Sequence, residues 1–317
     1  MTRALAFWTV APGVGEIREQ MLPNPGADEV LVRTIATGVS RGTESLVFTG
    51  RVPPSQHQTM RAPLMGGAFP FPVKYGYAAV GRTTDGARVF VLHPHQDVFL
   101  APSAMCSPVP HAVPSHRAVL AANMETAVNI LWDAVPLVGQ RIMVIGAGVV
   151  GLLTASLLAR IPATVVTVVD TEFSRAGFAD RFGCGFATPD KAPGDQELIV
   201  HASASEAGLR LALDRAAFEA RIIEASWYGD RAPSVPLGEA FHARRLQLIA
   251  SQVGTIAPVM RGRRTYAERL TIALALLTDP AYDLLLDGPT PFEGLPDAMP
   301  AILTPGGLCH VITYGNE

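Results

Sequence analysis

Three glycines form the pattern in this sequence that most clearly predicts chemistry. Gly146, Gly148 and Gly151 have the spacing GxGxxG, and they follow the apolar run 141–145 and open an apolar segment of helical character. In a strand–turn–helix unit the first glycine makes the tight turn. The second lets a phosphate group approach the backbone, and the third lets the helix pack on the strand. The pattern therefore predicts a phosphate-binding turn between a strand and a helix.

The residues after this turn complete the pattern. Val149 and Val150 begin the predicted helix, whose unpaired N–H groups and positive dipole end favour an anion. Asp170 ends the next predicted strand, 19 residues after Gly151. A carboxylate at this position accepts hydrogen bonds from ribose hydroxyls and repels a 2′-phosphate, so NAD(H) is favoured over NADP(H). The alternative is a strand–helix–strand unit that binds no nucleotide and whose glycines serve packing alone.

Histidine and cysteine give no metal site by spacing. His93 and His95 form an HxH pattern without a third ligand nearby, so we interpret them as loop histidines. Cys106, Cys184 and Cys309 are far apart and none belongs to a CxxC pair. We expect free, apolar thiols and neither a disulfide framework nor a cysteine-bound structural zinc.

Composition limits the class of protein. The chain has 317 residues, 49% of them apolar and 17% charged, which is typical of a globular protein large enough for two domains. A net charge of −3 and the lack of basic runs longer than RGRR at 261–264 argue against a nucleic-acid partner. The N-terminal apolar stretch is short and interrupted by proline, so we expect no signal peptide, no membrane span and a cytoplasmic location.

The texture of the sequence changes along the chain. Residues 1 to about 120 carry short β-type runs separated by proline- and glycine-rich turns, which indicates an irregular β domain. From about 121 to 258, apolar strands alternate with helical stretches, which predicts βαβ units and a parallel sheet. Two helix candidates and two short strands follow Pro258. The fold class is therefore α/β.

Four segments resemble the medium-chain dehydrogenase/reductase superfamily of the zinc alcohol dehydrogenase type. They are ATGVSRGTESL at 36–46, KYGYAAVGR at 74–82, ARVFVLHP at 87–94 and METAVNILWDA at 124–134. The resemblance covers nearly the whole chain, and it implies a GroES-like catalytic domain over 1–122. It also implies a Rossmann doubly wound domain over 123–258 and a C-terminal segment, 259–317, that returns to the first domain. Within the superfamily, SRGTESLVFTGRVP, YGYAAVG and CHVITYG most resemble bacteriochlorophyllide-type dehydrogenases, which oxidise a 1-hydroxyethyl side chain on a tetrapyrrole.

The same resemblance implies that the zinc ligands are missing. The family's ligand cysteine falls on Ser40, its ligand histidine on Tyr77, and the neighbouring glutamate on Ala78. A neutral hydroxyl and a phenol with a pKa near 10 are poor ligands for zinc. Only Glu125 falls where relatives place a carboxylate near the metal, and one carboxylate does not hold a catalytic zinc. We therefore expect no zinc.

Without a metal, protein groups must polarise the carbonyl and handle the proton. We expect Tyr77 to serve as hydrogen-bond donor or acid, with Ser40, Thr43 and Glu125 as relay partners. The alternatives are that Tyr77 is a core phenol with a satisfied hydroxyl and that Glu125 is a carboxylate favoured by a helix N-terminus.

Two further residues are candidates for cofactor binding. Arg41 falls where the family places an arginine that binds the pyrophosphate, a role that suits a guanidinium. His201 follows a predicted strand of the nucleotide domain and is expected to line the cofactor pocket through its backbone. The segment 222–254 has the strand–loop–strand texture of the second half of the nucleotide domain. In the superfamily this edge strand often pairs two subunits, so the resemblance implies a homodimer.

Three functions remain open from the sequence. The first is a metal-independent NAD(H)-linked oxidoreductase that interconverts an alcohol and a carbonyl on a sizeable, partly apolar small molecule held between the two domains. The second is a zinc-free quinone or enoyl reductase of the same superfamily. The third is a non-catalytic nucleotide-binding or sensing module, because a fold alone does not establish an activity.

Overall fold

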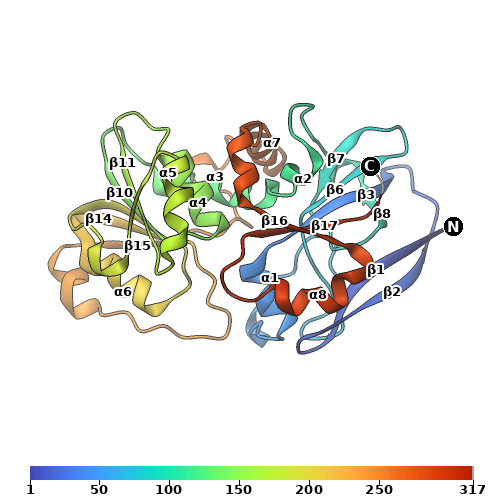
Figure 1. Cartoon of the computed structure of the whole chain (residues 1–317), viewed down its shortest axis with the longest axis horizontal. Helices are drawn as coiled ribbons and strands as arrows, with labels where there is room; N and C mark the ends of the chain where they lie inside the picture. Colours follow the sequence, from blue (N-terminus) through green and yellow to red (C-terminus); the bar gives the residue numbers. More distant parts are fainter. Residues whose placement is uncertain (316–317) are drawn as a thin grey trace. The chain divides into compact units, whose positions relative to one another are not determined.

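The computed structural model describes residues 1–315, and the chain divides into two compact units. Unit 1 comprises residues 1–122 and 273–317, and unit 2 comprises residues 123–272. Figure 1 shows the course of the chain through both units.

Unit 2 is built on a six-stranded sheet in the order β12-β11-β10-β13-β14-β15, and all of its strand pairs are parallel. Its strands are β10 (Arg141–Ile145), β11 (Val165–Val169), β12 (Gly185–Ala187), β13 (Gln196–His201), β14 (Ala216–Glu224) and β15 (Gln247–Ala250). Its helices include α4 (Val149–Leu158), α5 (Ala176–Arg181) and α6 (Glu206–Arg215). The strand order reverses between β10 and β13. The carboxyl ends of these two strands therefore form the topological switch point of a doubly wound sheet.

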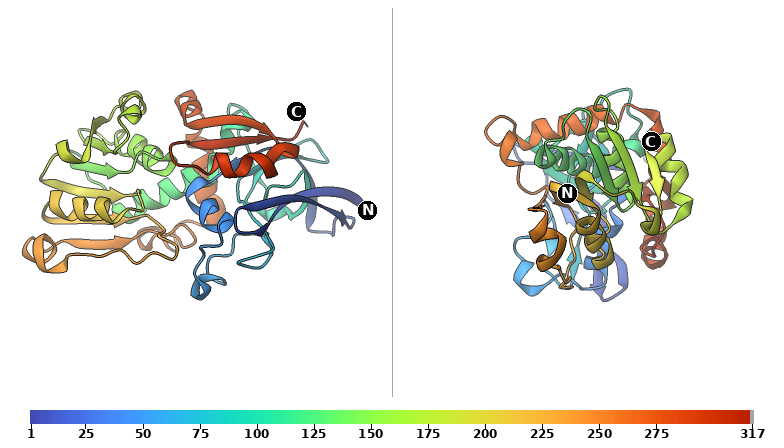
Figure 2. Two further views of the ribbon diagram at one scale, coloured as in Figure 1. Left: turned by 60° about the horizontal axis from the view of Figure 1, so that its bottom comes forward. Right: turned by 90° about the vertical axis from the view of Figure 1, so that its left-hand side faces the viewer.

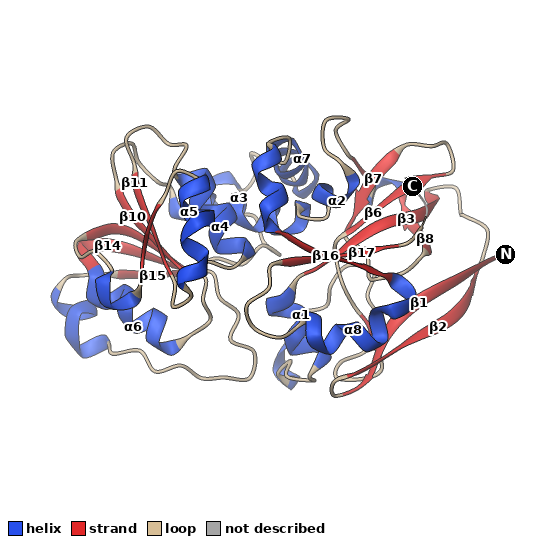
Figure 3. Cartoon of the chain, viewed as in Figure 1, coloured by secondary structure: helices blue, strands red, loops and turns tan. Residues whose placement is uncertain are grey.

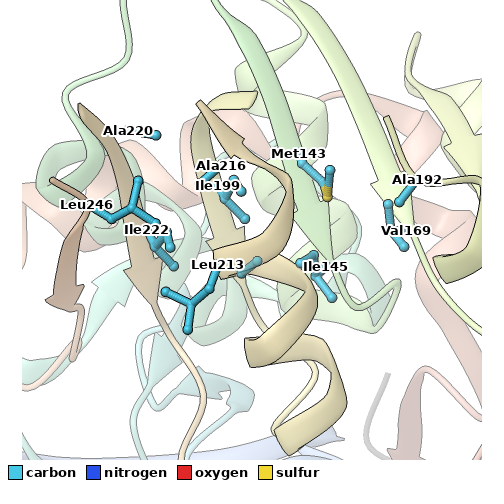
Figure 4. Close-up of a cluster of buried hydrophobic side chains, with 11 residues drawn as sticks. Met143, Ile145, Val169, Ala192, Ile199, Leu213, Ala216, Ala220, Ile222 and Leu246 are labelled. Atoms are coloured by element: carbon cyan, nitrogen blue, oxygen red, sulfur yellow. The ribbon is translucent and has the colours of Figure 1, made fainter. Parts of the chain in front are cut away.

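Apolar side chains between this sheet and α6 form a core of unit 2 (Figure 4). Met143 and Ile145 come from β10, Ile199 from β13 and Ile222 from β14, and Leu213 comes from α6. All five are at most 3% exposed. The continuous apolar strands of the sequence are thus explained by a parallel sheet covered by helices.

Unit 1 contains two sheets rich in antiparallel pairs. One has the order β2-β1-β5-β4, and the other runs β16-β17-β3-β6-β7-β9, with β8 also paired to β3. The strands are β1 (Thr2–Ala11), β2 (Val14–Leu22), β3 (Glu29–Val39), β4 (Gly66–Gly67), β5 (Val73–Lys74), β6 (Ala79–Thr83), β7 (Arg88–Val91), β8 (Val98–Pro102), β9 (Ser107–Pro108), β16 (Leu286–Pro291) and β17 (Cys309–Thr313). The β1–β2 hairpin is drawn in dark blue in Figure 2.

The C-terminal segment completes unit 1. Strand β17 pairs antiparallel with β3, with His310 opposite Val39. Helix α8 (Leu295–Ile302) packs with α1 (Arg41–Phe48) around a cluster that includes Phe292 and Met299. The chain therefore returns to its N-terminal unit after crossing unit 2 (Figure 3).

The return to unit 1 begins later than the sequence suggests, at residue 273 and not at 259. Helix α7 (Tyr266–Leu276) carries Arg269, whose buried guanidinium pairs with Glu125 of α3 (Ala121–Ala134) at 3.0 Å. This ion pair joins α7 to α3 within unit 2. Helix α2 (Ser115–Ala118) precedes α3.

Among the described residues, no helix has the length and apolar character that crossing a bilayer requires.

Candidate functional site

The glycine turn of unit 2 has the geometry that the sequence predicts. Gly146 follows β10 with φ +105°, a conformation that L side chains rarely adopt, and a Cβ there would lie 2.8 Å from the backbone nitrogen of Ser203. A Cβ on Gly151 would collide with the carbonyl oxygen of Gly146. Both positions therefore require glycine for the turn and for the approach of α4 to the strand.

Gly148 is different, because a Cβ there would meet no protein atom within 4 Å. It is the exposed N-cap of α4, and no side chain caps the N–H groups that begin with Val149 and Val150. An open glycine at the start of an uncapped helix fits the pyrophosphate of a dinucleotide. These residues would hold the phosphates of a nicotinamide dinucleotide.

Asp170 lies beside this turn, directly after β11. One carboxylate oxygen accepts a hydrogen bond from the Ala147 N–H at 2.6 Å, and the other accepts from the Glu172 N–H at 2.9 Å. The carboxylate is thus fixed next to the glycine turn while its side chain stays partly accessible. This arrangement suits an acceptor for ribose hydroxyls.

A cluster of three hydroxyls lies in unit 1, where the resemblance places the zinc ligands. The phenol of Tyr77, between β5 and β6, is hydrogen-bonded to the side chains of Ser40 and Thr43 at the start of α1. The structure therefore brings together three of the four residues that the sequence offers as catalytic candidates. Their roles remain predictions.

Burial raises the pKa of Tyr77 to about 12, and the negative charge of Glu44 acts in the same direction. Hydrogen bonding with the side chains of Ser40 and Thr43 lowers this pKa in part. Tyr77 is therefore a neutral phenol at pH 7, which can donate a hydrogen bond.

A buried hydrogen-bonded pair, Glu44 and His95, supports this cluster, and the sequence did not predict it. Glu44, on α1, accepts a hydrogen bond from the Ser40 N–H at 2.7 Å through one oxygen. Its other oxygen lies 2.9 Å from Nε2 of His95, and the two side chains are only 3% and 1% exposed. His95 also packs against Gly76, whose φ of +115° and close contact with the imidazole exclude a larger residue. The pair thus joins the two segments that carry Ser40 and Tyr77.

The far side of His95 continues into the core of unit 1. Its Nδ1 lies 2.7 Å from Thr37 Oγ1, which is in turn 3.0 Å from the hydroxyl of Tyr314. His93 is also buried and stacks on Phe99 with ring centroids 3.7 Å apart. Both histidines of the HxH pattern are therefore loop residues with buried side chains.

The residues at the implied zinc position do not fit zinc. Ser40, Tyr77 and Ala78 supply two neutral hydroxyls and a methyl group where thiolate, imidazole and carboxylate are required. Within residues 1–315, no group of three or more His, Cys, Asp or Glu side chains is placed to hold a metal ion. The three cysteines are free.

Glu125, the fourth catalytic candidate, lies on α3 in unit 2. Its carboxylate pairs with Arg269, which also donates to Asn129 Oδ1 at 2.6 Å and to the Val253 carbonyl at 2.6 Å. Burial raises the pKa of the Glu125 carboxyl, and Arg269 offsets this in part. The observed partner favours a structural role, and the relay role stays a prediction.

Arg41 and His201, the two further cofactor candidates, lie in different units. The guanidinium of Arg41 covers the backbone of Gly307 in unit 1, where a Cβ would collide with it. His201 ends β13 in unit 2, and its imidazole is fully buried. Their contacts with a cofactor remain predictions.

Comparison with solved structures shows the same fold. The chain is similar to a short chain alcohol dehydrogenase from E. coli CFT073 complexed with NADH, with TM-score 0.79, 16% identity, and 99% of this chain and 100% of that chain covered. It is also similar to L-idonate 5-dehydrogenase from E. coli K-12, with TM-score 0.80, 12% identity and 99% of both chains covered. For benzyl alcohol dehydrogenase from Acinetobacter calcoaceticus the TM-score is 0.78 and the identity 15%, with 99% of this chain and 100% of that chain covered.

These likenesses confirm the predicted fold class: an α/β chain with a GroES-like irregular β unit and a Rossmann doubly wound unit. No model of a known protein family matches the chain, and no curated protein matches its sequence.

Proposed function

We propose that this protein is a metal-independent, NAD(H)-dependent oxidoreductase that interconverts an alcohol and a carbonyl on a sizeable, partly apolar substrate. The observation that carries this proposal is the Tyr77–Ser40–Thr43 hydroxyl cluster at the position that the resemblance gives to a zinc centre. The open glycine turn of unit 2 supports NAD(H) as the cofactor.

A bound nicotinamide would supply or accept the hydride, so the chain's own task is to orient the substrate and stabilise charge on its oxygen. Each of the three hydroxyls can donate or accept a hydrogen bond. The proposed role requires that Ser40 and Thr43 donate to the phenol oxygen of Tyr77, so that the phenol proton is left for the substrate. A carbonyl oxygen would take this proton as it becomes an alcohol, and the neutral state of Tyr77 at pH 7 suits that role.

The test is Tyr77→Phe, with Tyr75→Phe as the matched control. The two rings lie 6.0 Å apart in a T-shaped contact, so both variants remove a phenol oxygen from the same region. We expect Tyr77→Phe to lower turnover roughly 100-fold or more, the usual size of a general-acid contribution, and to leave NADH affinity unchanged. Equal turnover in both variants would contradict the role of Tyr77.

The assay should offer an aromatic alcohol, its ketone and an enone side by side. A 1-hydroxyethyl tetrapyrrole, the substrate class of the closest resemblance, belongs in the same panel. Reduction of the enone C=C alone would favour the quinone or enoyl reductase function. NADH binding without turnover on any substrate would favour the sensing module.

Metal independence and assembly are also proposals. Activity should persist after treatment with a chelator, because the residues at the implied zinc position are hydroxyls.

We propose a homodimer through β15, which lies at the edge of the unit 2 sheet and leaves one side of its backbone for pairing. Light scattering on the purified protein measures the mass, and a monomer would exclude this assembly.

A further inference from the structure

A second polar cluster lies in unit 2, at the carboxyl ends of β13 and β14. His201 is at its centre, with Nδ1 2.7 Å from Oε2 of Glu224 and Nε2 2.7 Å from Oγ of Ser203. A serine, a histidine and a glutamate are thus joined in one line of short hydrogen bonds. This is the arrangement in which a base activates a hydroxyl nucleophile and a carboxylate orients the base.

The partners of His201 determine its tautomer. An ionised Glu224 can only accept, so Nδ1 carries a proton and donates it to Oε2. In the neutral imidazole Nε2 is then an acceptor, and the hydroxyl proton of Ser203 points to it. The other oxygen of Glu224 accepts from the Ser226 N–H at 2.8 Å, which fixes the carboxylate.

The two ends of the line, Ser203 and Glu224, are partly accessible, and the Glu224 side chain is 15% exposed. Ser203 is partly accessible, whereas the His201 side chain is fully buried. The next residue, Ala204, is held at φ +50° with its N–H donating to Ser226 Oγ, so the turn that carries Ser203 is fixed. The hydroxyl of Ser205 lies 2.9 Å from that of Ser203 and accepts from the Gly208 N–H, so its own proton is available to Ser203.

We propose that Ser203 is an activated nucleophile that accepts the acyl group of esters whose leaving group departs as an anion. Its Oγ forms a bond to the acyl carbon and its proton passes to Nε2 of His201, while the bond from the acyl carbon to the leaving oxygen breaks. The electron pair of that bond leaves with the anion. The imidazolium then passes its Nδ1 proton to Glu224, whose partly accessible carboxylate releases it to solvent.

The burial of His201 limits which leaving groups can depart and how fast the acyl group is released. A fully covered imidazole cannot bring a proton to a poor leaving group or activate a free water molecule, so turnover requires groups that the cluster lacks. We therefore expect a single acylation of each chain, with slow release. The inference uses neither NAD(H) binding nor Tyr77, so it stands or fails separately from the proposed function.

The probe is p-nitrophenyl acetate, added to the full chain without cofactor. We expect a burst of about one nitrophenolate per chain and one acetyl group on Ser203 by peptide mass spectrometry. Ser203→Ala should lose both. Ser205→Ala is the matched control, because it removes a neighbouring hydroxyl and leaves the Ser203–His201–Glu224 line intact, so it should keep the label on Ser203.

Glu224→Gln tests the role of the tautomer. The amide can donate to Nδ1, which moves the proton to Nε2 and removes the acceptor for Ser203, so the burst should slow roughly 100-fold or more. Circular dichroism establishes that each variant is folded. An acetyl group found only on lysines, or an unchanged burst in Ser203→Ala, would overturn the proposal.

Discussion

The contacts of the buried pair Glu44 and His95 allow a quantitative prediction of the free energy of unfolding. Glu44→Ala removes both acceptors at once, the one 2.7 Å from the Ser40 nitrogen and the one 2.9 Å from His95 Nε2. Both side chains are almost fully buried, so bulk water has little access to the imidazole that loses its partner. Leaving a buried donor without its acceptor costs about 1–3 kcal/mol, and Glu44→Ala leaves two such donors, so we expect a loss of about 2–6 kcal/mol in the free energy of unfolding.

Glu44→Gln should cost less. The glutamine oxygen still accepts from Ser40, and the amide can donate to Nε2 of His95 if the imidazole proton moves to Nδ1 and points to Thr37. Replacing charge-assisted bonds by neutral ones lowers the expected cost to about 1–2 kcal/mol. The difference in the free energy of unfolding between the two variants measures the cost of leaving the imidazole of His95 without a partner.

Urea unfolding followed by circular dichroism measures these free energies. The control is Glu19→Ala, which breaks an exposed pair with Arg3 whose side chains are 52% and 64% accessible. We expect this change to cost less than about 1 kcal/mol. If Glu44→Ala costs no more than Glu19→Ala, the pair does not anchor the hydroxyl cluster and the reasoning is refuted.

Three further predictions concern the glycine turn, Asp170 and His93. Gly148→Ala should leave stability unchanged, because the added methyl meets no protein atom. It should weaken NADH binding at least tenfold, because the methyl occupies the phosphate position. Gly151→Ala collides with the turn itself, so it should lower both the melting temperature and the affinity for NADH. Asp170→Ala should weaken NADH binding by roughly tenfold and reduce the preference over NADPH, as titrations with both nucleotides would show. Burial, followed by the charge of Lys74, lowers the pKa of His93 to about 3 from 6.5, so the folded protein takes up this proton later than the unfolded chain. Stability is therefore lost as the pH falls below 6.5, by about 2 kcal/mol at pH 5, and His93→Gln should lose correspondingly less in urea unfolding at the two pH values.

The fold was largely predictable because its signals are local. The GxGxxG spacing, the strand before it and Asp170 after it lie within 30 residues and share one supersecondary unit, and the structure shows that unit between β10 and β11. The unit boundary after residue 122 agrees with the change in sequence texture. The later boundary does not agree with it. The segment before that boundary includes Arg269, which contacts Glu125, 144 residues earlier, and no local pattern predicts such a contact.

The site was predictable only in part. The resemblance located Tyr77, Ser40 and Thr43, and the structure joins their side chains. His95 and Glu44 are 51 residues apart, and nothing in the local pattern of either predicts their pairing. The spacing of Ser40 and Glu44 was the one available signal, since a glutamate in the first turns of a helix can reach back to the N-cap backbone.

The polar cluster around His201 was also missed for a physical reason. Ser203 is adjacent in sequence, but Glu224 reaches His201 only because β13 and β14 pair in parallel, with these two residues opposite each other. Side-chain pairs across a parallel sheet depend on register, which sequence texture does not determine.

The central claim is that the glycine turn binds a nicotinamide dinucleotide in a protein that needs no metal. A fluorescence titration of the wild-type chain with NADH, in the presence and absence of excess EDTA, tests it most directly. We predict saturable binding of about one NADH per chain with the same Kd in both conditions. The absence of saturable binding, or a Kd that weakens when EDTA is added, would contradict the account.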